Sequence, residues 1–106
     1  MKKFHIRIIG GWCGNRMVMI RDFLAEMFEV QGYDIKLDQQ SIWENNAPPT
    51  LVDLVLQLIP AFSSEELNCP SLNIRPFLKD LQHQETLDAI DQTVKEYYPV
   101  PAEMPV

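Results

Sequence analysis

The stretch Ile6-Arg-Ile-Ile-Gly-Gly-Trp-Cys-Gly-Asn-Arg-Met-Val-Met-Ile20 places a single cysteine, Cys13, between a strand pattern and a helix pattern. At the amino end of a helix, backbone N–H groups lack intrahelical acceptors and the helix dipole favours an anion. That environment lowers the pKa of a thiol and suits a thiolate or a bound phosphate. The sequence therefore predicts a functional thiol at Cys13, and the alternative is a small residue in a tight loop.

A phosphate-binding loop is predicted around this cysteine. Glycine and asparagine adopt the backbone angles of an anion nest, and arginine donates hydrogen bonds to phosphoryl oxygens. The predicted phosphate-binding residues are Gly10, Gly11, Gly14, Asn15, Arg16 and Met17. Ser63 and Ser64 are further candidate hydroxyl donors from a facing loop.

Two other thiol chemistries fit the spacing poorly. A cysteine-dependent phosphatase needs an arginine six positions after its cysteine, and Met19 stands there. A Cys-x-x-Cys redox motif needs a second cysteine three positions away, where Gly10 and Arg16 stand. A monothiol role stays open, whereas a dithiol mechanism is excluded.

Composition limits the class of protein. The chain has 106 residues with 46% hydrophobic residues, which is enough for one domain with a core. Its net charge of −6 argues against a nucleic-acid partner. It has two cysteines, Cys13 and Cys69, in different sequence contexts, so we expect a reducing, cytoplasmic location and a structural role for Cys69. No Cys/His spacing suits a metal, and no cofactor is expected.

Hydrophobic periodicity predicts alternating strands and helices. The expected strands cover residues 4–9, 33–38, 51–59 and 71–75, and the expected helices cover 16–31 and 84–97, with a short helix beginning at Ser63. This order predicts an α/β fold, namely a single-domain three-layer sandwich with a four-stranded parallel sheet and helices on both faces. We expect one domain over residues 1–98 and a proline-rich tail over 99–106.

The strand order follows from polarity. The third strand is the most apolar and the second strand is the least apolar. An order of 2-1-3-4 buries the third strand inside the sheet and puts the second strand at an edge. Strands one and three then lie side by side and their connections diverge, which makes a topological switch point. Ligands bind at such points, beside the carboxyl ends of the strands, where the 10–16 loop is expected.

Residues 4–97 resemble the sugar-specific enzyme IIB component of the bacterial phosphotransferase system, of the galactitol and ascorbate type. The similar segments are Cys13-Gly14-Asn15, Met17-Val-Met-Ile20, Val52-Asp-Leu-Val-Leu56 and Asn68-Cys-Pro-Ser-Leu-Asn-Ile-Arg-Pro-Phe77. The family has a longer loop, with serine and threonine donors, between the cysteine and the helix.

The resemblance implies a phosphotransferase. Cys13 would form a phosphocysteine by accepting phosphate from a histidine of a IIA protein and would pass it to a sugar bound by a membrane-embedded IIC permease. Two alternatives stay open. One is a degenerate IIB-like regulatory or interaction module without phosphotransfer, and the other is a thioredoxin-like monothiol redox protein, which predicts a β-hairpin after the second strand.

Overall fold

The computed structural model describes residues 4–11, 14–43, 47, 49, 51–63, 65–67 and 69–98. The elements in this part of the chain are β1 (Phe4–Gly10), α1 (Gly14–Val30), β2 (Ile35–Ser41), β3 (Leu54–Gln57), β4 (Ser71–Asn73), the 3₁₀ helix η1 (Arg75–Leu78) and α2 (Gln84–Tyr97). The helix predicted over 84–97 has the bounds of α2, whereas α1 begins two residues earlier than predicted. Cys13 and the predicted tail 99–106 lie outside the described residues.

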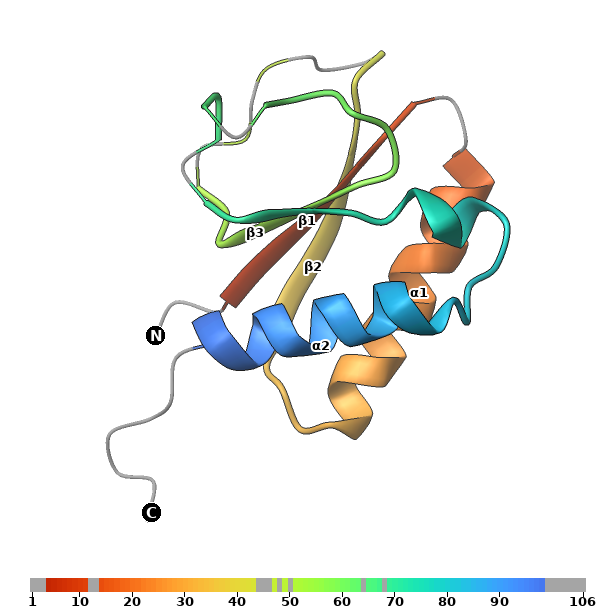
Figure 1. The fold of residues 1–106 in the computed structure, drawn as a ribbon, viewed down its shortest axis with the longest axis vertical. Coiled ribbons are helices and arrows are strands. Elements are labelled where there is room, and N and C mark those ends of the chain that lie inside the picture. Colours follow the sequence, from red (N-terminus) through yellow and green to blue (C-terminus); the bar gives the residue numbers. More distant parts are fainter. Residues whose placement is uncertain are drawn as a thin grey trace.

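The four strands form one parallel sheet in the order β2-β1-β3-β4, which confirms the predicted topology. β1 crosses the middle of the molecule with β2 and β3 beside it (Figure 1). The chain leaves β1 toward β2 and leaves β3 toward β4. The switch point between β1 and β3 is therefore present.

Both helices pack on one face of the sheet. Neighbouring residues of a strand point to opposite faces, and this face carries Ile6 and Ile8 of β1 with Leu54 and Leu56 of β3. The helix side chains that complete this core are almost fully buried, and they are Met17, Ile20, Leu24, Phe28, Ile90 and Val94. Figure 1 shows α2 running across α1 in this layer.

The connection that follows β3 covers the opposite face. Its apolar residues Phe62 and Leu67 pack against Ile9 and Val55 in a second, smaller core cluster. Helices were expected on both faces, but among the described residues both lie on the first face and the third layer of the sandwich is loop. The segment is short, and Pro70 disfavours helical angles in the residue before it.

The helix expected at Ser63 is a turn. The Ser63 N–H and hydroxyl donate to Glu66 Oε1 at 3.0 and 3.2 Å, which are contacts typical of a helix start. The chain continues as a turn at residues 65 and 66, after which Leu67 is buried. The hydrogen bonds typical of a helix N-cap are therefore present, but they are followed by a turn and not by a helix.

Two strand bounds differ from the prediction. β3 covers Leu54–Gln57 within the predicted 51–59, and Leu51 is 76% exposed. β2 lies two to three residues later than predicted, over Ile35–Ser41. None of the described helices is long and apolar enough to span a bilayer.

Candidate functional site at the carboxyl edge of the sheet

The predicted thiol site lies where the switch point lies. Cys13 itself is outside the described residues, but its flanking residues are not: β1 ends at Gly10 and α1 begins at Gly14. Leu58, which follows β3, donates its N–H to Ile9 O at 2.8 Å. The described residues that flank Cys13 therefore lie at the carboxyl end of β1, beside the end of β3, and at the amino end of α1.

Gly10 is required for packing. A Cβ atom at this position would stand 2.3 Å from Met17 Sδ and 3.4 Å from Leu58 Cδ1. Met17 is 2% exposed, so its side chain fills the space beside the glycine. Two of the six predicted phosphate-binding residues, Gly10 and Met17, therefore hold the first turn of α1 against the end of β1.

Gly11 is held by the segment after β2. Ser41 Oγ donates to Gly11 O at 3.2 Å, and the Ile42 N–H donates to Gly10 O at 3.0 Å. A Cβ on Gly11 would stand 3.2 Å from Nε1 of Trp43, whose side chain is 64% exposed. The backbone before Cys13 is therefore fixed from the β2 side, and an aromatic ring borders it.

The amino end of α1 favours an anion. The N–H groups of Gly14, Asn15 and Arg16 stand in the first turn of the helix and have no intrahelical acceptor. No acidic residue stands in the first turn. This terminus therefore carries positive potential with no nearby carboxylate in the turn to cancel it.

Arg16 is directed away from the predicted loop. Its guanidinium donates from Nη2 to the carbonyl oxygen of Phe77 in η1 at 3.0 Å. Its Nε is buried and has no hydrogen-bond partner. The side chain predicted to hold a phosphate thus joins α1 to η1 instead.

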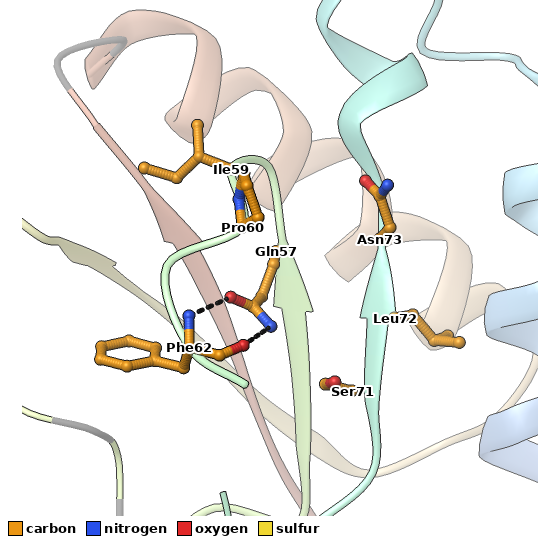
Figure 2. Close-up of a pocket in the computed structure, with 7 residues that line it drawn as sticks. All are labelled: Gln57, Ile59, Pro60, Phe62, Ser71, Leu72 and Asn73. Atoms are coloured by element: carbon orange, nitrogen blue, oxygen red, sulfur yellow. Dashed lines mark hydrogen bonds between the residues drawn. The ribbon is translucent and has the colours of Figure 1, made fainter. Parts of the chain in front are cut away.

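The loop facing the switch point is built around Gln57. This side chain is 8% exposed, and its Oε1 accepts the N–H groups of Ala61 and Phe62, each at 3.0 Å. Its Nε2 donates to Phe62 O at 3.1 Å (Figure 2). Of the predicted hydroxyl donors on this loop, Ser63 is occupied by Glu66 and Ser64 lies outside the described residues.

A hollow opens beside this loop. It measures about 300 Å³, and its walls come from the end of β3, the loop and β4. Figure 2 shows Gln57 and Ser71 on its floor, Pro60 and Phe62 along one side and Asn73 at its far end. It therefore adjoins the switch point on the β3 side and leads to the edge of the sheet.

A polar cluster on the loop-covered face was missed by sequence reasoning. The Arg7 guanidinium donates to both carboxylate oxygens of Asp38, at 2.9 and 3.0 Å. His5 Nε2 lies 2.8 Å from Asp38 Oδ2, and His5 Nδ1 lies 3.2 Å from Leu51 O. The sequence did contain a signal for this cluster. Arg7 and Asp38 each occupy a polar position in an alternating strand pattern, and the two residues are register partners on adjacent parallel strands.

These contacts change the ionisation of the cluster. Burial by itself raises the pKa of Asp38, but the hydrogen bonds and charges of Arg7 and His5 outweigh it, so the pKa is lowered. The hydrogen bond to Asp38 raises the pKa of Arg7 against the effect of burial. The cluster is therefore an ion pair that joins β1 to the edge strand β2.

Acidification is expected to remove the stabilisation that Asp38 provides. Because its pKa is lower in the folded than in the unfolded chain, its contribution is present above the ordinary carboxyl range and is lost as the pH falls through the folded-state pKa. Asp38→Asn should cost about 1–2 kcal/mol at neutral pH and progressively less toward acid pH. Urea unfolding across pH measures this, with exposed Asp22→Asn as control. A difference between wild type and Asp38→Asn that stays constant with pH would contradict it.

The second cysteine has the features of a structural residue. Cys69 is half-buried beside the second core cluster. Burial, with the charge of Asp53 adding to it, raises the pKa of its thiol. The thiol is therefore held in its neutral form, which is a poor nucleophile.

The described residues contain no group of three or more His, Cys, Asp or Glu side chains placed to hold a metal ion. No protein-family model matches this chain, and searches of curated proteins and of solved structures found no significant match. The function is therefore argued from the fold and the switch-point geometry alone.

Proposed function

We propose that this chain is a cytoplasmic phosphocarrier of the enzyme IIB type. In this proposal Cys13 accepts a phosphoryl group from a histidine of a IIA protein and transfers it to a sugar held by a membrane IIC permease. The observation that supports it is that the residues before and after Cys13 lie at the carboxyl end of β1, which pairs with β3, and at the amino end of α1. A thiolate and a phosphoryl group are both stabilised at such a position.

Each transfer is a substitution at phosphorus. The Cys13 thiolate attacks the phosphohistidine, an S–P bond forms as the N–P bond breaks, and the imidazole leaves and takes up a proton. In the second step a sugar hydroxyl attacks, loses its proton and releases the thiolate. The first N–H groups of α1 would bind the phosphoryl oxygens in both steps. Arg16 donates from Nη2 to Phe77 O, so it would reach a phosphoryl group only through its other guanidinium nitrogens.

Phosphorylation is expected to depend on Cys13 and not on Cys69. Incubation with phosphorylated IIA proteins of galactitol and ascorbate systems should add the mass of one phosphoryl group to the wild type and to Cys69→Ser. Cys13→Ala should gain none, because the half-buried Cys69 thiol has a raised pKa and stays neutral. Intact-protein mass spectrometry measures this, with an authentic IIB domain as positive control. A wild type that gains no mass while that control is phosphorylated would refute the proposal.

A second candidate is a IIB-like docking module without phosphotransfer. The placement of Arg16 favours it, because the cation nearest the predicted loop is committed to η1. The rate of Cys13 alkylation against pH, measured in a Cys69→Ser background, separates the two. Reactivity that begins more than a unit below the ordinary thiol range, about 8.5, supports the phosphocarrier, whereas an ordinary profile supports the module.

The redox alternative receives no support from the sheet. It predicts a β-hairpin after the second strand, whereas the next strand among the described residues, β3, lies on the side of β1 away from β2, and the described strand pairs are parallel.

A further inference from the structure

The edge strand β4 presents unpaired backbone groups. The Val55 N–H donates to Pro70 O at 3.1 Å, and the Ile74 N–H donates to Gln57 O at 2.9 Å. Since successive residues of a strand point their N–H and C=O groups to opposite sides, residues 70, 72 and 74 bond to β3. The N–H and C=O groups of Ser71 and Asn73 therefore face the open edge, and no described loop or side chain hydrogen-bonds to them.

Two hollows adjoin this edge. The first, of about 300 Å³, reaches Ser71 and Asn73 from the loop-covered face. The second, of about 490 Å³, is lined by Asn73 and by the η1 residues Arg75 and Pro76, with Leu78 and Lys79 behind them. Both hollows include Asn73. An extended chain lying along β4 would thus find space for side chains beside the strand and beyond its carboxyl end.

The charge at one end of the edge is positive. Arg75 and Lys79 are exposed, and neither forms an ion pair within the described part of the chain. This is a local exception, because the net charge of the chain is −6. A ligand that adds to β4 and carries a carboxylate near η1 would pair with these two cations.

We propose that the open edge of β4 binds an extended, acidic peptide segment of a partner protein by strand addition. The backbone of the peptide pairs with Ser71 and Asn73, its side chains enter the two hollows, and an acidic side chain lies against Arg75 and Lys79. This edge is separate from the switch point, so the inference does not depend on Cys13 or on the proposed phosphotransfer.

The test is a selection of peptides from a displayed random heptapeptide library on the wild-type protein. A Ser71→Pro variant, checked for cooperative unfolding, serves for counter-selection because proline has no N–H to donate at the open edge and carries its ring there instead. The expected result is a set of acidic peptides that bind the wild type about tenfold or more tightly than the variant, as the loss of one or two hydrogen bonds requires. Failure to enrich such peptides would overturn the proposal.

Two further measurements use the best enriched peptide. N-methylation at alternate residues should abolish binding in one register and leave it in the other, a result that docking of side chains alone would not give. Charge reversal at Arg75 and Lys79 should weaken binding about tenfold, whereas the matched change Lys36→Glu on β2 should leave it unchanged. Binding that ignores the methylation register would refute strand addition. Self-association abolished by Ser71→Pro would make a second copy the occupant and refute the partner peptide.

Discussion

Replacing Gln57 with leucine is expected to lower the free energy of unfolding by about 3 kcal/mol. The leucine fills a similar volume but removes three hydrogen bonds, to the N–H groups of Ala61 and Phe62 and to Phe62 O. Each buried group left without a partner costs about 1–3 kcal/mol, and partial access of water reduces the sum. Urea unfolding followed by circular dichroism measures the loss.

The substitution Gln57→Glu tests the acceptor and the donor roles of the Gln57 amide separately. Gln57→Glu retains an oxygen for the two N–H groups but places the second oxygen against Phe62 O. It should therefore destabilise the protein at neutral pH and recover part of the loss in acid, where a protonated carboxyl donates to Phe62 O. Wild-type stability in Gln57→Leu would show that the 58–62 loop is not held by this side chain.

The sheet could be predicted from the sequence because its order depends on polarity along each strand. Leu54, Val55 and Leu56 form a continuous apolar run, which predicted an interior strand, and all three are fully buried. Lys36 and Asp38 interrupt β2 at every second position, which predicted an edge. Local patterns were sufficient here because the polarity of the residues in each strand reflects how deeply that strand is buried.

The structure of the loop that covers the second face of the sheet could not be predicted in the same way. Gln57 reads as a polar end to an apolar strand, and nothing near it in the sequence shows that its amide organises the next five residues. The Ser63 and Glu66 pair gave a correct local contact and a wrong element. The conformation of this segment depends on the tertiary packing of Phe62 and Leu67, which hydrophobic periodicity does not predict.

The predicted site likewise combines features that local sequence patterns indicate with contacts that only the folded chain brings together. The order strand, glycines, cysteine, helix predicted a loop at the switch point, and the described residues on either side of it are the end of β1 and the start of α1. The roles of Gly10 and Arg16 were assigned from residue type alone, and the structure gives them tertiary partners, Met17 and Phe77 O. These partners lie 7 and 61 positions away along the sequence, so only the folded chain brings them into contact.

Adding a single methyl group at Gly10 is expected to destabilise the protein by about 2 kcal/mol. In Gly10→Ala the new Cβ would stand 2.3 Å from Met17 Sδ, so the buried methionine or the first turn of α1 must move. Overpacking of a filled core costs about 1–3 kcal/mol. Because the moving element is the amino end of α1, the same variant should also weaken phosphorylation of Cys13 if the proposed phosphotransfer is correct.

A double-mutant cycle isolates the contact. Met17→Ala alone removes a buried side chain and should cost about 2–5 kcal/mol. In that background the Gly10→Ala methyl group enters the vacated space, so its cost should fall toward zero and the two effects should be strongly non-additive. Gly11→Ala is the matched control, since its Cβ would stand 3.2 Å from the partly exposed Trp43 ring, which can shift. Additive effects of Gly10→Ala and Met17→Ala would mean that the glycine is not required for the approach of α1 to β1.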